Sequence, residues 1–311
     1  MSLLKFKDTL PDRNAARGVT VESVGGLGNQ LFAYSVGVEL SRRLNCPLFV
    51  DTTWFKRNTD RSFSLGSFAS CFREVHSGAR RRELSVRLAS RIERIKKRDP
   101  IGDLQFPVSH RYIEHGYFFD SKVLSLPVGA RLRGYFQSWK YFEDSAMQIR
   151  LELQSLRSPS AWFLEQSAKE PTQQDWVGVH VRRGDYLNPE VQKVHGILGH
   201  EYYERALNLV ESRHGVRPIK VFSDDIQAAR QLIKGRQRTI EFVKPPNDSH
   251  PLESLVLLSQ GSSIITANSS FSWWAAWLGQ ADGRTVVVPE KWYAATTFTK
   301  EDLFLPDWQI I

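Results

Sequence analysis

The chain is poor in cysteine and shows no pattern of metal ligands. Its 311 residues include only two cysteines, Cys46 and Cys71, which lie too far apart for a metal-ligand spacing. They are interpreted as free or buried thiols of a protein from a reducing compartment. The eight histidines show no pairing at ligand spacing, and no Cys-x-x-Cys occurs. The sequence therefore predicts neither a disulfide framework nor a structural zinc site.

The chain also lacks a long apolar run. No stretch approaches the roughly 20 apolar residues that span a bilayer. The polar leader, residues 1–18, has no apolar core long enough for a secretion signal. We therefore expect a cytoplasmic protein, unless the chain has been trimmed from a longer precursor. Internal repeats and low-complexity segments are absent as well.

Basic residues exceed acidic ones, 42 against 34, giving a net charge of +8. This excess favours an anionic partner without choosing among nucleotides, membranes and nucleic acid. Residues 79–98 form a basic amphipathic pattern, which suits a core-docked helix with a solvated face. Peripheral contact with an anionic membrane, at the inner face of the cell membrane, is the alternative. No recognised nucleic-acid module is present, so a nucleic-acid partner is not expected.

Periods of strand and helix alternate in two halves of the chain. Residues 19–24 predict a strand, the glycines that follow a tight turn, residues 31–44 a helix, and residues 47–51 the next strand. The polar, proline-flanked stretch 157–175 predicts a domain boundary. Strands are then predicted at 176–181, 219–223, 262–267 and 284–288, with helices between them, and this pattern indicates a second doubly wound parallel sheet.

The resulting prediction is an α/β protein with one domain at 19–160 and a second at 161–290. The aromatic segment 291–311 is expected to pack back across both.

Two arginines stand at the end of the strand 176–181. Ligands of open parallel sheets bind outside the carboxyl ends of the strands, which makes Arg182 and Arg183 candidates. A guanidinium offers a planar fork of donors that suits phosphate oxygens. Because side chains alternate along a strand, one arginine can enter a cleft while its neighbour pairs with a carboxylate such as Asp185.

The strand near 262–267 ends in Asn268-Ser269-Ser270, directly before a helix that begins with Phe271. Small polar residues can cap a helix and still leave backbone N–H groups for an anion. A plain helix cap is the alternative. An arginine fork facing this helix end would hold a diphosphate.

Two further stretches have weaker signals. In "FSDD", the adjacent aspartates diverge too much for a metal pair, so Ser223 or Asp224 is expected to cap the following helix, with Asp224 alternatively facing a nucleotide. "GGLGNQ", residues 25–30, lacks both the Lys-Ser/Thr of a P-loop and the third glycine of a dinucleotide fingerprint. Its glycines would still allow a ligand to approach the backbone.

Together these stretches carry a family resemblance. "GGLGNQLFAYSVGVELSRRL", "HVRRGDY", "VHGILGHEYYERAL", "VFSDD" and "ITANSSFSWWAAWL" occur in one order over most of residues 19–295. The sequence resembles glycosyltransferase family 11, the α-1,2-fucosyltransferases.

The resemblance implies a GT-B-like fold of two facing Rossmann-type domains and a GDP-β-L-fucose donor. In such a fold 19–160 would be the acceptor-side domain and 161–290 the GDP-sugar donor-binding domain. It further implies an inverting reaction that needs no metal or other cofactor, with the 2-hydroxyl of a terminal β-galactose in an oligosaccharide as the acceptor.

The resemblance also implies roles for individual residues. Arg182 would hold the β-phosphate, and Glu253 would read guanine. The expected donor-binding set is His180, Arg182, Arg183, Asp224, Glu253, Asn268, Ser269, Ser270 and Phe271. The expected fucose- and acceptor-facing set is Gly26, Gly28, Asn29 and Gln30.

The catalytic candidates are Arg182 and three residues that follow it. Glu190 and His195 match positions that the resemblance marks as candidate bases. Asp185 is a third candidate, although it is expected instead to orient the arginine. The sequence does not choose among them.

The alternatives to a fucosyltransferase are a transferase for another GDP-sugar and a non-catalytic nucleotide- or glycan-binding protein on the same frame. Among the tryptophans, Trp273, Trp274 and Trp277 at helical spacing are expected in the core. Trp54 and Trp139 are the candidates for stacking on an acceptor sugar.

Overall fold

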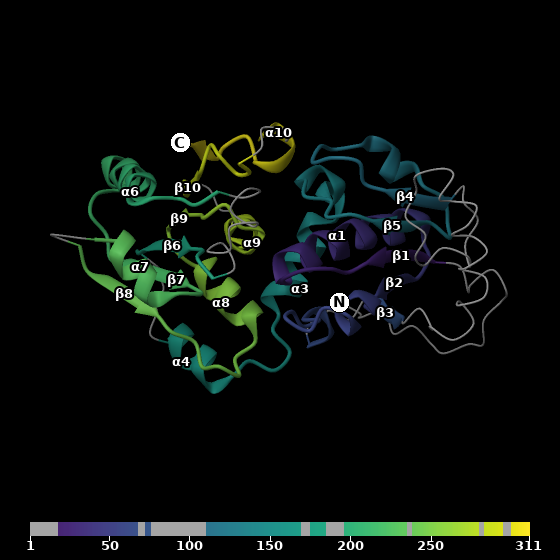
Figure 1. Ribbon diagram of the computed structural model, residues 1–311, viewed down its shortest axis with the longest axis horizontal. Coiled ribbons are helices and arrows are strands. Elements are labelled where there is room, and N and C mark those ends of the chain that lie inside the picture. The colour runs from purple at the N-terminus through teal and green to yellow at the C-terminus, as the bar shows by residue number, and fades with distance from the viewer. Residues whose placement is uncertain are drawn as a thin grey trace.

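The computed structural model describes residues 18–67, 72–75, 110–168, 175–184, 196–234, 238–279, 283–294 and 300–311. The leader, the basic stretch 79–98 and Cys71 therefore lie outside the described residues, as do the three base candidates after Arg183. Figure 1 shows two lobes, each built around a sheet, with α1, α3, α8 and α9 between them. None of the helices in the described ranges is both long enough and apolar enough to cross a membrane.

The first lobe contains a parallel sheet in the order β3-β2-β1-β5-β4. The chain enters at the central β1 and runs outward through β2 to β3, and it returns on the other side of β1 through β4 and β5. The point at which the order reverses lies between β1 and β5. The strands are β1 (Val19–Glu22), β2 (Leu48–Asp51), β3 (Phe72–Val75), β4 (Arg111–Ile113) and β5 (Arg131–Arg133), and the main helix is α1 (Leu27–Leu44).

The second lobe contains a parallel sheet in the order β11-β10-β9-β6-β7-β8, which is the Rossmann arrangement with β6 as its first strand. Its order reverses between β6 and β9. The strands are β6 (Val177–Val181), β7 (Ile219–Ser223), β8 (Ile240–Val243), β9 (Ser263–Ile265), β10 (Thr285–Val288) and β11 (Gln309–Ile310). The helices are α6 (His200–His214), α7 (Ile226–Leu232), α8 (Pro251–Leu258), α9 (Ser270–Leu278) and α10 (Lys300–Leu303).

The prediction of two facing Rossmann-type domains is therefore confirmed. The sequence analysis placed β6, β7, β9 and β10 correctly but did not predict β8 or β11. Both are short, and β8 is exposed at the edge of the sheet, so it lacks the continuous apolar run of a buried strand.

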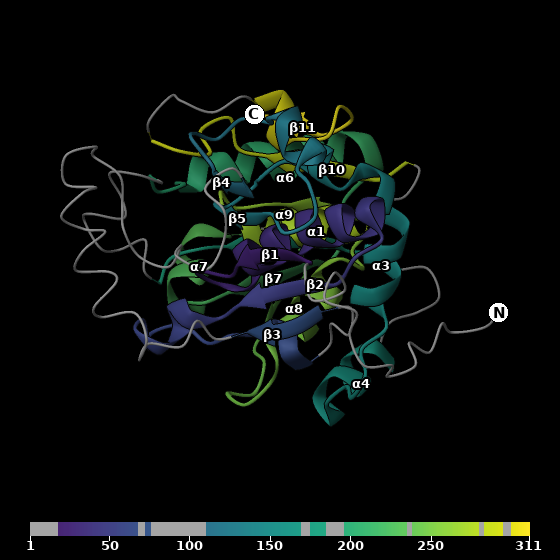
Figure 2. The same ribbon diagram turned by 90° about the vertical axis from the view of Figure 1, so that its right-hand side faces the viewer.

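Two segments connect the lobes. Helices α3 (Ala146–Gln154) and α4 (Ala161–Ala168) lead from the first sheet to the second, and α4 packs against α8. The C-terminal segment adds β11 to the second sheet and also reaches the first lobe, where the Asp302 carboxylate accepts from Lys140 and from the Phe119 N–H. Figures 1 and 2 show this segment above both lobes.

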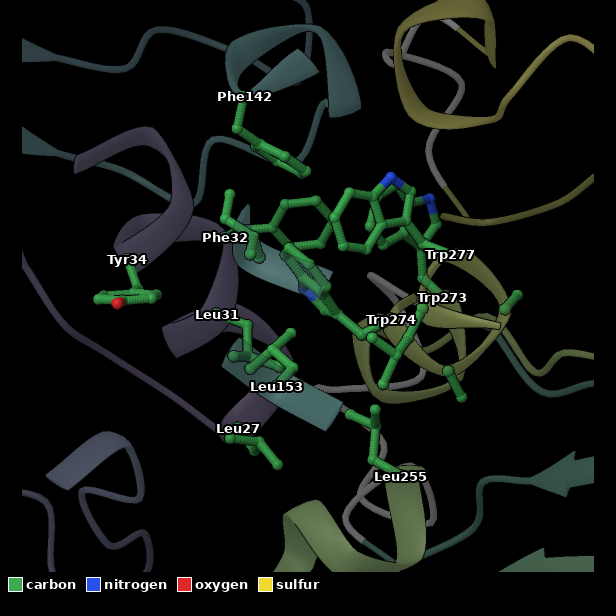
Figure 3. Close-up of a cluster of buried hydrophobic side chains, with 14 of the residues drawn as sticks. Leu27, Leu31, Phe32, Tyr34, Phe142, Leu153, Leu255, Trp273, Trp274 and Trp277 are labelled. Carbon is green, nitrogen blue, oxygen red and sulfur yellow. The ribbon is translucent and has the colours of Figure 1, made fainter. Parts of the chain in front are cut away.

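An aromatic core joins the two lobes at the crossing of α1 and α9. Trp273 and Trp274 are fully buried on α9, and their rings lie 4.6 and 5.0 Å from the Phe32 ring on α1. Figure 3 shows these rings with Phe142 and Trp277 in one cluster. The prediction that Trp273, Trp274 and Trp277 belong to the core is confirmed.

Gly28 makes the close approach of α1 and α9 possible. A Cβ atom at this position would lie 2.5 Å from the Ser270 carbonyl carbon and 2.7 Å from the Phe271 nitrogen. Trp274 Nε1 donates to the Gly28 carbonyl oxygen at 2.9 Å. The N-termini of the two helices are thereby held side by side, so residues from both lobes meet at one place.

Candidate functional site

A cavity of about 820 Å³ lies where the carboxyl ends of the two sheets face each other. The second lobe contributes the ends of β6, β7, β8 and β9 and the N-terminus of α9. The first lobe contributes the N-terminus of α1 and the segments around residues 54–64 and Gln137. Ligands of doubly wound sheets bind at the reversal of strand order, and here both reversals open into one space.

Arg182 comes from the end of β6 and lines this cavity. Its Nη1 atom lies 2.8 Å from Asp224 Oδ2, and its side chain is 21% exposed. The same carboxylate accepts from the Arg183 backbone N–H through Oδ1 at 2.8 Å. Asp224 therefore holds the guanidinium from the end of β7. Asp185, the expected partner, lies outside the described residues.

Arg183 points elsewhere. Its Nη2 atom donates to the Leu198 carbonyl oxygen at 2.9 Å, and it does not line the cavity. The two arginine side chains thus diverge, as alternation along a strand predicts, and a contact of Arg183 with the donor stays a prediction that this arrangement does not favour.

The N-terminus of α9 opens into the same cavity, beside Arg182. Asn268, Ser269, Ser270 and Phe271 all line it. Ser269 is the N-cap residue, yet its side chain makes no capping hydrogen bond, so the first N–H groups of the helix have no capping side chain. Unsatisfied N–H groups and the positive end of the helix dipole favour an anion. The arginine and the helix N-terminus that the sequence analysis singled out therefore line the same cavity.

His180 is buried behind this wall and lines the cavity. Its ring stacks on Phe271 with centroids 5.2 Å apart, and its Nδ1 atom has no hydrogen-bond partner among the described residues. Burial, and secondarily the Arg182 charge, lower its pKa from 6.5 to about 3. The imidazole is therefore neutral at physiological pH in this structure.

The two aspartates of "FSDD" have separate tasks. Asp224 binds Arg182, whereas Asp225 Oδ1 accepts from the Ala228 N–H at 2.9 Å and so caps α7. Ser223 and Asp224 were expected to cap this helix, but the capping residue is Asp225, one position after Asp224. Across the described ranges no three His, Cys, Asp or Glu side chains gather as metal ligands would.

Glu253 does not lie in the cavity. It is 3% exposed, and its two oxygens accept from the Ser160 N–H at 2.6 Å and the Ser160 hydroxyl at 2.8 Å. Its carboxylate is thus committed to the start of α4, and the expectation that it reads guanine does not fit this structure. The loop after β8, residues 244–247, lies in the cavity instead, together with Phe222 and Ser254.

On the first-lobe side, Gly26, Gly28 and Asn29 line the cavity, but Gln30 does not. The Gln30 amide nitrogen donates to the carbonyl oxygens of Gly25 and Ser62, both at 2.9 Å, and its oxygen accepts from the Ser64 N–H at 2.8 Å. Gln30 is fully buried. Instead of facing a sugar, it holds the segment that brings Asp60, Arg61 and Ser62 to the cavity.

Of the two tryptophans considered for sugar stacking, Trp54 lines the cavity and is half-buried. Trp139 does not, because it packs against the core and donates through Nε1 to the Phe304 carbonyl oxygen at 3.2 Å. The sequence analysis missed Gln137, Trp292 and Tyr293, which line the cavity without any charge or motif to mark them.

Fold and site together define a class of protein. Two facing Rossmann-type sheets, with an arginine and a helix N-terminus at the mouth of one of them, are the arrangement of a GT-B-type glycosyltransferase. The family comparison is specific: the model of glycosyl transferase family 11 matches residues 80–311, and the chain belongs to this family. The predicted resemblance and the prediction of a glycosyltransferase are both confirmed. The "GGLGNQ" segment lies before the matched range.

Two Escherichia coli proteins align along almost their whole length. The O-antigen biosynthesis glycosyltransferase WbnK is 29% identical over 301 residues, which cover 91% of this chain and 97% of the relative. An alpha-1,2-colitosyltransferase is 29% identical over 297 residues, or 88% of this chain and 92% of the relative.

Other relatives match over a smaller part of the chain. The human galactoside alpha-(1,2)-fucosyltransferase 1 is 31% identical over 189 residues, which cover 57% of this chain and 51% of that protein. Among solved structures, the fucosyltransferase NodZ from Bradyrhizobium superposes with a TM-score of 0.46 at 14% identity, covering 83% of this chain and 91% of that one. This likeness is too low to carry an argument about the site.

Proposed function

We propose that the protein transfers L-fucose from GDP-β-L-fucose to the 2-hydroxyl of a terminal β-galactoside, with inversion and without a metal ion. The observation that carries the proposal is the meeting of Arg182, held by Asp224, with the N-terminus of α9 in the inter-lobe cavity. Membership of family 11 and relatives named as galactoside alpha-(1,2)-fucosyltransferases support the sugar and the linkage.

The chemistry requires stabilisation of the leaving group. As the bond from fucose to phosphate breaks, negative charge grows on GDP. In the proposed mechanism the Arg182 guanidinium and the N–H groups of Ser270 and Phe271 meet that charge in a preorganised arrangement. Ser269 and Ser270 add hydroxyl groups on the helix side, and Asn268 and neutral His180 complete the wall.

The guanine base of the donor is proposed to fit beside Phe222 and the loop 244–247, in place of the expected contact with Glu253. This loop follows β8 and lies in the cavity on the same side as Arg182. The fucose and acceptor are assigned to the other side, near Gly26, Gly28, Asn29 and Trp54.

The acceptor hydroxyl must lose a proton. We assign this step to Asp185, Glu190 or His195, which follow Arg182 in the chain and lie outside the described residues. An alanine variant of the true base removes the acidic limb of the kcat–pH profile, whereas the other two variants retain it.

A second sugar donor, GDP-colitose, is favoured by one specific observation. A relative covered over 92% of its length is named as a colitosyltransferase, and colitose lacks the 3-hydroxyl of fucose. A GDP-colitose donor would use the same diphosphate and base contacts, so the choice between the two sugars depends on the first-lobe side of the cavity.

The test begins with a thermal-shift screen of GDP, UDP, ADP, GDP-fucose and GDP-colitose. A ligand at 100 times its Kd stabilises the folded state by about 2.7 kcal/mol, so GDP compounds should raise the Tm while UDP and ADP do not. Transfer to lactose is then measured with and without EDTA, and the linkage of the product is determined. Loss of turnover in EDTA, or a product that is not α-1,2-linked, contradicts the proposal.

A further inference from the structure

A chain of three polar side chains crosses the cavity between the lobes. Gln137 Nε2 donates to Asn29 Oδ1 at 2.9 Å, and the Tyr293 hydroxyl donates to Gln137 Oε1 at 2.5 Å. All three residues line the cavity. Asn29 lies in the first turn of α1, Gln137 follows β5, and Tyr293 follows β10 of the second lobe. We call Asn29, Gln137 and Tyr293 the amide relay.

The relay has a direction in this structure. The Tyr293 hydroxyl donates to the Gln137 oxygen, and the Gln137 nitrogen donates to the Asn29 oxygen. The Asn29 nitrogen is left with two N–H groups and has no hydrogen-bond partner within the described part of the chain. In this orientation Asn29 offers donors to a ligand, whereas the reverse orientation of both amides would offer an acceptor.

The backbone around the first relay residue makes room for this amide. Gly25 adopts a φ of +71°, and a Cβ atom there would lie 2.9 Å from Asn29 Nδ2. Any larger residue would therefore meet the amide nitrogen. The Asn29 side chain is only partly buried, which leaves it accessible from the cavity.

Gln137 is held by an unusual backbone. Phe136, directly before it, has a φ of +50°, a left-handed conformation that is unfavourable for an aromatic residue. The Glu114 carboxylate stabilises this turn, because it accepts from the N–H groups of Tyr135 at 2.6 Å and Phe136 at 3.0 Å. Strained backbone that the surroundings enforce is concentrated at functional sites.

Tyr293 is fixed as well. It is 8% exposed, and its ring stacks on Tyr117 of the first lobe with centroids 4.6 Å apart. The hydrogen bond to Gln137 and the stack on Tyr117 therefore both join the two lobes.

We propose that Gln137 and Tyr293 are positioning residues for sugar transfer, acting by fixing the Asn29 amide with its N–H groups toward the sugar end of the cleft. The inference rests on the proposed function, because it assigns a part of that reaction. Arg182 and α9 serve the diphosphate on the other side, so the relay should affect transfer far more than GDP binding.

The test is a double-mutant cycle of Asn29→Ala and Gln137→Ala, with Tyr293→Phe as a minimal third variant. Turnover of GDP-fucose is measured with lactose and, as hydrolysis, without acceptor, and the Kd of GDP is measured in parallel. Each single substitution should lower kcat about 10- to 100-fold, the effect of losing one well-placed hydrogen bond. Gln137→Ala should cost nothing further once Asn29 is alanine, because Gln137 acts through it.

The controls separate positioning from folding. Tyr112→Phe removes another tyrosine hydroxyl bond, to Asp120 at 2.9 Å, at a residue outside the cavity lining, and should leave kcat unchanged. Gln137→Asn, which keeps the amide on a shorter stem, replaces Gln137→Ala in the cycle if the latter lowers the Tm.

The outcomes are distinct. Additive losses in the cycle, or a loss of GDP affinity as large as the loss of kcat, overturn the relay while leaving the proposed function intact. Wild-type protein that binds no GDP overturns both. Hydrolysis of GDP-fucose without transfer to lactose contradicts the proposed acceptor. The double-mutant cycle is then evaluated from the rates of hydrolysis.

Discussion

The two walls of the cleft have the same scaffold but different polar groups. Each has a parallel sheet whose strand order reverses at the cavity, and each presents a helix, α1 or α9, whose N-cap residue makes no side-chain capping bond. Beside α9 stands the Arg182–Asp224 pair, whereas beside α1 stand the amides of Asn29 and Gln137. The first wall also carries Asp60 and Arg61, so the contrast concerns the groups next to the two helix N-termini. From it we propose a division of labour, with the diphosphate on the second lobe and the sugar hydroxyl groups near the amides of the first.

The strongest challenge to this comparison is a pair of matched arginine variants. Arg182→Lys should lose about 3–4 kcal/mol of transition-state stabilisation, or roughly 10²–10³ in kcat, because an ammonium cannot make the fork. Arg183→Lys should lose less than tenfold, because its guanidinium contacts Leu198 outside the cavity. Steady-state kinetics with GDP-fucose compare them, and equal losses would remove the distinction between the two side chains.

The contact between the walls can be broken at one glycine. Gly28→Ala should destabilise the protein by about 2–4 kcal/mol, because its Cβ would press on the backbone of Ser270 and Phe271 at the crossing of α1 and α9. Gly26→Ala is the control, since a Cβ there meets nothing within 4 Å. Urea unfolding measures both, and a fully stable Gly28→Ala variant would show that the helices can separate without cost.

The role of Asp224, the carboxylate beside Arg182, can be tested by comparison with its neighbour Asp225. Asp224→Asn should lower kcat about 10- to 100-fold with little change in Tm, because it weakens the pair that orients Arg182. Asp225→Asn should keep kcat, because asparagine also caps helices well. If the two variants lose activity equally, the "FSDD" stretch acts as a unit and the separate tasks are wrong.

The smallest expected effect concerns His180. Its pKa is lowered to about 3 in the folded state from 6.5, mainly by burial, so the unfolded chain binds the extra proton between these values. This residue's contribution to stability is therefore complete above pH 6.5 and falls as the pH drops, by up to about 1.4 kcal/mol per unit. A His180→Gln variant should show a flatter decline in urea unfolding between pH 6.5 and 4.5, and a parallel decline would refute the buried neutral imidazole.

The second wall could be predicted from sequence because its signals are local. Arg182 ends an apolar strand, and Asn268-Ser269-Ser270 ends another before a helix, so strand-end reasoning brought them together. The first wall depends on long-range contacts. Gln137 reaches the cavity because Phe136 adopts a left-handed backbone conformation that Glu114 stabilises. No residue in "GYFQSW", residues 134–139, predicts that turn.

The site candidates that lie outside the cavity lining have a common explanation. Gln30 and Glu253 carry polar groups suited to a ligand, but tertiary structure brings Ser64 and Ser160 to them, and these partners are distant in sequence. For Arg183, the alternation of side chains could be predicted from the sequence, but not which of two neighbours faces the cleft.

A crystal structure with GDP-fucose tests the central claim most directly. The account predicts the β-phosphate within hydrogen-bonding distance of the Arg182 guanidinium and the N–H groups at the start of α9, with the fucose directed toward Asn29. A diphosphate bound at the N-terminus of α1, or a fucose lying against the second lobe alone, would contradict the division of labour between the two walls.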